Sequence, residues 1–194
     1  MLRLRPAGAA DAGRVAELLI DTRRAFMPYA PLAHAELDLR HWVARVLVPA
    51  GGVVLAELAG PGQGCGQGGV QGHGQGHGPV AAPAGSAGAP PATVLAMMAT
   101  EAAAPAHWIT QMAVDPAWVG RGIGTRLLQH ALASLAPPIR LYCFQANTGA
   151  RRWYERHGFV AIAFSDGQDN EEHCPDVLYE HAGGPAAARA GPLT

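Results

Sequence analysis

Three glycines, at positions 120, 122 and 124, stand at alternate places directly before a segment whose apolar residues have helical spacing. Glycine in this pattern weakens both strands and helices, because it adds no packing and loses much conformational freedom on folding. The preceding stretch "HWITQMAV" (107–114) is typical of a strand. A strand, a glycine turn and a helix in this order predict a place where a ligand meets the bare backbone. Phosphate fits this place, since free N–H groups and the helix dipole converge there.

Apolar periodicity predicts the other elements of the chain. Asp11 is expected to cap the first helix. A strand pattern follows the helix that comes after the glycine turn. This order of strand, turn, helix and strand predicts a right-handed crossover. The expected fold class is therefore α/β, or α+β, with a mixed sheet. Strands are expected over 2–5, 51–60, 93–101, 107–114, 139–144, 159–164 and 175–180, and helices over 12–26, 33–48, 127–135 and 148–157.

Between about 60 and 92 the chain consists almost entirely of Gly, Ala, Pro and Gln. Such a segment cannot bury enough apolar surface to offset its ordering entropy, so we expect a disordered insertion. Strand patterns flank it, which predicts a lengthened hairpin inside one domain, 1–182, followed by a flexible tail, 183–194. His73 and His77 lie on this glycine-rich stretch without fixed geometry, which favours a solvated loop over a metal site. No metal is expected.

Charge and cysteine content argue against several classes of protein. The net charge is −1, which implies no basic surface for nucleic acid or anionic lipid. Cys65, Cys143 and Cys174 are an odd number without paired spacing, so neither a disulfide framework nor a zinc site is expected. Charged residues interrupt the apolar N-terminal segment, and no run has the length of a membrane span. A cytoplasmic setting without nucleic-acid or membrane partners is therefore expected.

Two familiar phosphate loops fit the stretch "VDPAWVGRGIGTRLL" poorly. A P-loop ends in Gly-Lys-Ser/Thr, whereas Gly124 is followed here by Thr125 and Arg126. The dinucleotide-binding fingerprint requires a glycine at position 125 and an acidic residue about twenty positions later, where Gln145 and Asn147 stand. The glycine turn therefore belongs to neither class.

The same stretch resembles the acyl-CoA pyrophosphate loop of the GNAT superfamily of N-acetyltransferases, whose signature is Gln/Arg-x-x-Gly-x-Gly/Ala. Gly122 and Gly124 occupy its glycine positions, and Arg121 stands where the family often has arginine. Val119 replaces the usual Gln or Arg, which removes a side-chain contact. The family's loop binds pyrophosphate mainly through backbone N–H groups, so binding is expected to survive this departure.

A second block makes the resemblance specific. The stretch "NTGARRWYERHGF" (147–159) is similar to the family's later motif, Asn-x-x-Ala-x-x-Phe-Tyr-Glu-x-x-Gly-Phe. Trp153 replaces one aromatic residue by another. Both blocks occur in the family's order and spacing, and the resemblance covers residues 93–180. The matching positions are Asn147, Ala150, Tyr154, Glu155, Gly158 and Phe159.

The resemblance implies a mostly antiparallel mixed sheet flanked by helices, with a splayed central strand pair that receives acetyl-CoA. The pantetheine arm would pair with the backbone of 112–114 as an added strand, and one N–H there would stabilise the oxyanion. The pyrophosphate would rest on the amides of 119–125. The implied cofactor-binding residues are Met112, Ala113, Val114, Val119, Gly120, Arg121, Gly122, Ile123, Gly124, Thr125 and Asn147.

Tyr154 is the residue that the resemblance assigns to acid catalysis. The implied reaction is direct attack of a primary amine on the thioester through a tetrahedral intermediate, after which coenzyme A leaves as a thiolate. A phenol that donates a proton to this thiolate eases its departure. The alternative role for Tyr154 is aromatic packing of its helix onto the sheet. Asn147 has two candidate roles as well, helix cap and cofactor contact.

The general base and the acceptor amine stay open at this stage. Glu101, His107, His34, Glu36 and a water chain are the candidates for the base, and the acceptor is a small-molecule or peptide amine. An acidic run suits a cationic amine or a plain solvated turn; its residues are Asp166, Asp169, Glu171, Glu172 and Asp176. The family's members are often dimers, which suggests a homodimer. The alternative function is a non-catalytic acyl-CoA-binding or regulatory module.

Overall fold

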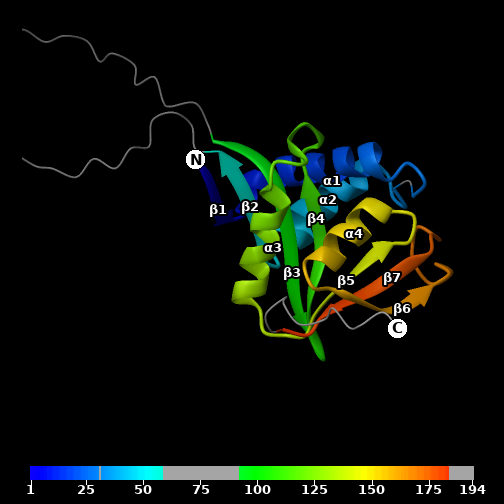
Figure 1. Cartoon of the computed structure of the whole chain (residues 1–194). Coiled ribbons are helices and arrows are strands. Elements are labelled where there is room, and N and C mark those ends of the chain that lie inside the picture. The colour runs from blue at the N-terminus through cyan, green and yellow to red at the C-terminus, as the bar shows by residue number, and fades with distance from the viewer. Residues whose placement is uncertain (31, 59–91, 184–194) are drawn as a thin grey trace, which may run out of the picture.

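The computed structural model describes residues 1–30, 32–58 and 92–183. In these ranges a seven-stranded sheet has the order β1-β2-β3-β4-β5-β7-β6, and helices cover it (Figure 1). The strands are β1 (Leu2–Pro6), β2 (Val53–Leu58), β3 (Thr93–Ala103), β4 (Ala106–Val114), β5 (Ile139–Phe144), β6 (Val160–Ser165) and β7 (Asp176–His181). The α-helices are α1 (Ala12–Phe26), α2 (Glu36–Trp42), α3 (Ile123–Ser134) and α4 (Thr148–Arg156). A π-helical turn, Val43–Leu47, extends α2, and short 3-10 turns span Ala9–Asp11 and Pro116–Trp118.

The helices form two layers, one on each face of the sheet. α1 and α2 lie on one face, while α3 and α4 lie on the other (Figure 1). Val15 and Leu18 of α1 belong to a buried cluster that includes Leu55 of β2. Leu127 and Leu128 of α3 belong to the second cluster, on the opposite face. The amphipathic patterns in the sequence therefore point to two separate cores divided by one sheet.

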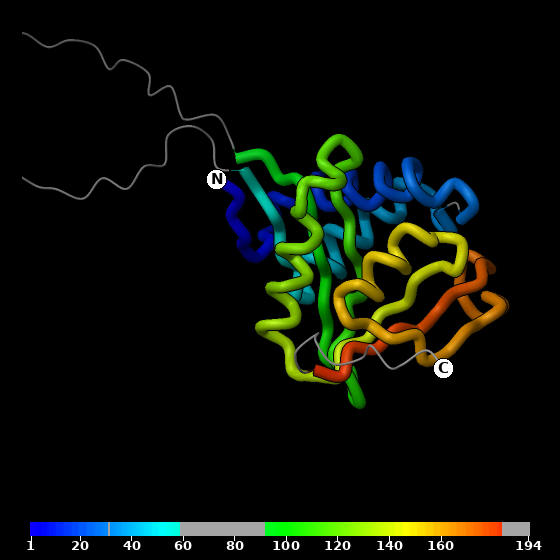
Figure 2. The backbone as a smooth tube through the Cα atoms, in the orientation of Figure 1, coloured from blue at the N-terminus to red at the C-terminus, as the bar shows by residue number. Residues whose placement is uncertain are grey.

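The central strand pair is splayed. β4 and β5 run parallel, as the predicted crossover requires, but they pair only at His107 with Ile139 and at Trp108 with Arg140. The other neighbouring strands are antiparallel. Figure 2 shows β4 and β5 meeting near their starts and diverging toward their ends. The predicted fold class, with its mostly antiparallel sheet and splayed pair, is confirmed.

β2 and β3 form the hairpin that the sequence predicts across the glycine-rich segment. They are antiparallel neighbours, with Leu58 opposite Thr93. The predicted insertion at 60–92, apart from residue 92, lies outside the described residues, as do Cys65, His73 and His77. The predicted tail lies outside them from residue 184 onward.

One predicted helix cap is wrong. Asp11 stands at the N-cap of α1, but its side chain makes no capping hydrogen bond to that helix. Its carboxylate instead accepts from the N–H of Gly8 and from the guanidinium of Arg5. Arg5 also donates to the buried Glu57. The strand-borne arginine competes successfully for the carboxylate because a charge-assisted pair is stronger than a bond to a neutral N–H.

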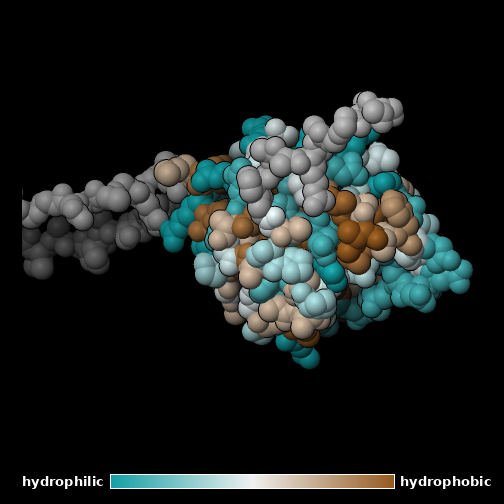
Figure 3. Space-filling view, turned by 60° about the horizontal axis from the view of Figure 1, so that its bottom comes forward, coloured by the Kyte–Doolittle hydropathy of each residue, from teal (hydrophilic) through white to brown (hydrophobic). Residues whose placement is uncertain are grey.

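The surface of the described residues mixes polar and apolar areas. Figure 3 shows brown apolar side chains in separate patches among hydrophilic ones. The edge strand β6 exposes Val160, Ile162 and Phe164, the last with 64% of its surface accessible. None of the helices in the described ranges combines the length and apolarity needed to cross a membrane.

Candidate active site

The glycine turn gives the candidate site its first feature, a row of unpaired backbone N–H groups. Gly120 and Gly122 have φ values of 81° and 77°, in the left-handed region that side chains disfavour. Gly122 stands at the N-cap of α3, and its carbonyl accepts from the N–H of Arg126. In the part of the chain that the structure describes, no group accepts from the N–H groups of residues 119–125. These donors lie at the N-terminal end of α3, where the helix dipole is positive, an arrangement suited to a bound anion.

Gly124 is needed for a different reason than the other two glycines. It lies in the first turn of α3 without a positive φ. A Cβ at this position would lie 3.4 Å from the Met112 Cε atom and 3.7 Å from both Trp153 and Val114. Gly124 therefore keeps side-chain volume out of the open end of the β4–β5 splay, where these neighbours gather.

Several polar contacts hold the loop before α3 in place. The Asp115 carboxylate accepts from the Ala117 N–H and from Arg14 of α1, at 2.6 Å for the latter. The carbonyl of Val114 accepts from the Thr22 hydroxyl at 3.1 Å. Arg121 is exposed, with its guanidinium over the Trp118 ring. The loop is thus fastened to α1, while its N–H groups stay available.

Tyr154 lies in α4 with its hydroxyl directed at β4. Only 9% of its surface is accessible, and the hydroxyl donates to the Met112 sulfur at 3.8 Å. Its ring packs against Trp153 and Phe159. Burial raises the pKa of Tyr154 well above its ordinary value, so the phenol keeps its proton through neutral and alkaline pH. The ring packing weighed from the sequence is present, and the hydroxyl faces the splayed strand, whereas the acid role of Tyr154 stays a prediction.

Asn147 caps α4. Its side-chain oxygen accepts from the N–H of Ala150 at 3.1 Å, which is the helix-cap role weighed from the sequence.

The rest of the second block is tied to β7 through a buried residue that sequence reasoning missed. The Tyr179 hydroxyl donates to Glu155 at 2.7 Å and accepts from Arg151. A lone tyrosine in an ordinary strand pattern carries no signal for such a network.

The four side chains weighed as general base occupy different environments. The Nδ1 atom of His107 donates to the Ala136 carbonyl at 2.8 Å, on the loop before β5. His34 lies 3.3 Å from Glu171, and Glu36 is paired with Arg24. Glu101 lies on β3 and lines a cavity of about 270 Å³. Among the described residues, Glu101 alone of these four has no hydrogen-bond or ion-pair partner.

The acidic run packs against the connection between α1 and α2. Glu172 pairs with Arg23 at 2.6 Å, and the Asp176 Oδ2 atom accepts from Asn170. The Cys174 thiol lies 3.5 Å from the Tyr29 carbonyl. Four of the five carboxylates therefore already have partners inside the protein, since Asp166 accepts from Gln168 and Glu171 lies against His34. The Oδ1 atom of Asp176 is buried without a partner among the described residues.

A bulge in β4 lies at the narrow end of the splay, and sequence reasoning missed it. The β3–β4 register passes from Ala99 opposite Gln111 to Thr100 opposite Ile109, so Thr110 is an extra residue. The Thr110 hydroxyl donates to the Ala99 carbonyl at 3.4 Å. A bulge bends its strand and frees backbone groups from the ladder. It therefore adds to the divergence of β4 from β5.

Comparison with known proteins agrees with this arrangement. Residues 85–161 match a family model described as an acetyltransferase (GNAT) domain. An acetyltransferase of the GNAT family from Bacillus cereus is similar at 11% identity, with a TM-score of 0.61 over 95% of this chain and 99% of that chain. The PaiA N-acetyltransferase of Thermoplasma acidophilum, solved with coenzyme A, has a TM-score of 0.57 at 13% identity, over 94% and 99%. The ribosomal-protein-S18-alanine N-acetyltransferase of Escherichia coli has 0.55 at 15% identity, over 100% of both chains.

No curated protein matches the sequence. At these identities the solved structures establish a shared fold, and the family model covers the segment that carries the glycine turn and the whole of the second block. Residues 85–161 therefore match an acetyltransferase (GNAT) domain, and the sheet with its splayed strand pair has the fold of GNAT-family acetyltransferases.

Proposed function

We propose that this protein is an N-acetyltransferase that moves an acetyl group from acetyl-CoA to a primary amine. The observation that carries the proposal is the row of N–H groups at 119–125, which have no acceptor within the described ranges and lie where β4 has diverged from β5. Buried or ligand-facing N–H groups need an acceptor, and a diphosphate supplies several oxygens in one place. The exposed Arg121 and Arg126 add positive charge at the same turn.

The free edge of β4 would hold the rest of the cosubstrate. Beyond Trp108, β4 has no strand partner on the side of β5, so the backbone from Ile109 to Val114 is available for strand-like pairing. Bound acetyl-CoA supplies an activated thioester carbonyl there. A backbone N–H of β4 would polarise that carbonyl and stabilise negative charge on its oxygen. Met112, Ala113 and Val114 are the residues that we assign to this pairing.

Tyr154 would act on the leaving sulfur. The amine nitrogen bonds to the carbonyl carbon, the carbon–sulfur bond breaks, and the sulfur takes the proton of the Tyr154 hydroxyl. The amine releases a proton to water as it becomes an amide, and the phenolate takes a proton back from solvent. A raised pKa keeps the phenol in its donating form, and its hydroxyl already faces the splayed strand at Met112.

The test is amine-dependent release of coenzyme A thiol from acetyl-CoA, measured over a panel of primary amines. An enzyme shows thiol release that rises with amine concentration together with the N-acetylated product in mass spectra. A non-catalytic acyl-CoA-binding module would instead show thermal stabilisation by coenzyme A and no amine-dependent thiol. That second pattern across the whole panel would overturn the proposed activity while leaving the binding site intact.

A further inference from the structure

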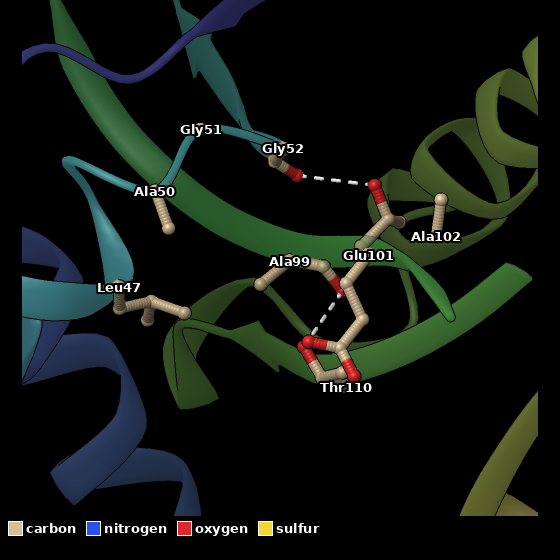
Figure 4. A pocket seen from close by; sticks show the side chains of 9 residues that line it. Leu47, Ala50, Gly51, Gly52, Ala99, Glu101, Ala102 and Thr110 are labelled. Atoms are coloured by element: carbon tan, nitrogen blue, oxygen red, sulfur yellow. Dashed lines mark hydrogen bonds between the residues drawn. The ribbon is translucent and has the colours of Figure 1, made fainter.

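A cavity lies on the face of the sheet that carries α1 and α2, beside the narrow end of the splay. Its volume is about 270 Å³, close to the lower end of about 300 Å³ at which small-molecule pockets begin. Figure 4 shows its walls: Leu47 and the loop before β2 on one side, and β3 with Thr110 of β4 on the other. It is thus large enough for a short aliphatic group with a polar end.

The loop before β2 shapes this cavity through Gly52. Gly52 has a φ of 75°, and a Cβ there would lie 2.1 Å from the Thr100 carbonyl oxygen. The Gly52 carbonyl accepts from both the N–H and the hydroxyl of Thr100. Only glycine permits this close approach, so the wall of the cavity is held rigidly against β3.

The polar groups of the cavity suit a cation. Glu101 is the one ionisable side chain among the lining residues, and Figure 4 shows it extending from β3 along the same wall as Thr110. Among the described residues nothing donates a hydrogen bond to the Glu101 carboxylate, whereas Glu171 and Glu172 of the acidic run face His34 and Arg23. The negative charge of the cavity therefore has no internal counter-ion in the described ranges.

The cavity is set apart from the expected place of the thioester. Glu101 stands opposite Trp108 in the β3–β4 register, so the two side chains share a face. The Trp108 ring stacks on Tyr142 of β5 at 5.7 Å, which continues that face across to the far side of the splay. Neighbouring strands lie about 4.8 Å apart, so a group in the cavity is displaced by at least one strand from a carbonyl held between β4 and β5.

We propose that this cavity binds a second positively charged group of the acceptor, with Glu101 as its counter-charge, while a different nitrogen of the same molecule is acetylated. The inference rests on the proposed function and narrows its substrate class to diamine-like acceptors. Leu47 and Ala99 supply apolar wall for the aliphatic stem, and Trp108, opposite Glu101 in the register, offers a ring for a cation–π contact.

The test compares 1,4-diaminobutane with butylamine, which has the same carbon chain and one cation fewer. We expect the wild-type protein to acetylate the diamine with a kcat/KM at least tenfold higher. Glu101→Gln keeps the shape of the side chain and removes its charge. It is expected to lower the ratio of kcat/KM for the diamine to kcat/KM for butylamine about tenfold, because one charge-assisted contact to the diamine is lost.

Glu171→Gln, on the acidic run, is the matched control and is expected to leave the diamine preference unchanged. A preference that survives Glu101→Gln, or that is lost in Glu171→Gln instead, would overturn the proposal. Calorimetric titration of 1,4-diaminobutane in the presence of coenzyme A gives a readout without turnover. If neither amine is acetylated, the proposed activity fails. Tenfold weaker diamine binding by Glu101→Gln would then still support the cavity, and equal binding would refute it.

Discussion

The hydroxyl of Tyr154 lies 3.8 Å from the sulfur of Met112, and this contact joins α4 to the unpaired edge of β4. The Met112 side chain is a flexible thioether, which adapts its shape at little energetic cost. The Met112 Cε atom also lies against Gly124 at the start of α3. Met112 thus stands between the glycine turn and the proposed acid.

Replacement of Tyr154 by Phe keeps the ring packing and removes only the hydroxyl. We expect single-turnover acetyl transfer at saturating amine to fall about 100-fold, with the KM for acetyl-CoA little changed, because the lost contact acts mainly in the transition state. Tyr142→Phe, at an exposed phenol on the opposite face, is the control. Transfer by Tyr154→Phe within threefold of wild type would leave Tyr154 as a packing residue.

The pH profile separates this acid from other groups. Burial raises the pKa of Tyr154 above its ordinary value of about 10, so the phenol donates throughout the range in which the amine loses its proton. We expect kcat/KM to rise from pH 7 to 10 without a descending limb, in wild type and, at a lower level, in Tyr154→Phe. A descending limb below pH 10 that disappears in Tyr154→Phe would contradict the raised pKa.

Met112→Ala should enlarge the space beside the Tyr154 hydroxyl. We expect the ratio of butyryl-CoA to acetyl-CoA turnover to rise about tenfold, since a longer acyl chain gains the volume that the thioether occupies. Val114→Ala removes a neighbour that approaches Gly124 without contacting the Tyr154 hydroxyl, and it should leave the ratio within twofold. Equal ratios in the two variants would show that Met112 does not limit acyl length.

Gly124 and Gly13 each occupy the second position of a helix, which makes them a matched pair. A Cβ at Gly13 meets nothing within 4 Å, whereas one at Gly124 meets Met112 at 3.4 Å. We expect Gly124→Glu to abolish coenzyme A binding in calorimetry, since it brings bulk and negative charge to the anion site. Gly13→Glu should bind normally. Binding by Gly124→Glu within about threefold of wild type, or roughly 0.7 kcal/mol, would refute the assignment.

Arg5→Met tests the ion network at the sheet edge. It leaves the Glu57 side chain, 6% exposed, without its cation, and we expect a loss of about 3 kcal/mol, or roughly 8 °C in Tm. Arg5 lowers the pKa of Asp11, and stability from a lowered carboxylate pKa is present above the unfolded value of about 3.9 and lost below it. The difference in Tm between wild type and Arg5→Met should therefore become smaller below about pH 4. Arg3→Met, at an exposed site on β1, is the control, and an equal Tm loss there would refute the role of the network.

Much of the fold could be read from local patterns. The strand–glycine turn–helix sequence at 107–135 predicts the crossover, and the parallel β4–β5 pair bears it out. Asn147 shows the same agreement, because its cap bond to Ala150 spans three residues and depends on local geometry alone. Asp11 shows the limit. Its local capping role lost to Arg5 on a strand, a competition that no neighbouring residue reveals.

Local sequence patterns were sufficient to predict the glycine turn, the elements around it and the second motif, because backbone preferences and apolar periodicity act over a few residues. The tertiary structure alone decided which side chains meet: Tyr154 with Met112, Tyr179 with Glu155, and Glu101 with the cavity under Gly52. Each of these contacts depends on strand register, and the bulge at Thr110 lies between Ile109 and Met112 on the strand that meets Tyr154. Register is set by the packing of the whole sheet, and a shift of one residue turns every side chain of a strand to the other face.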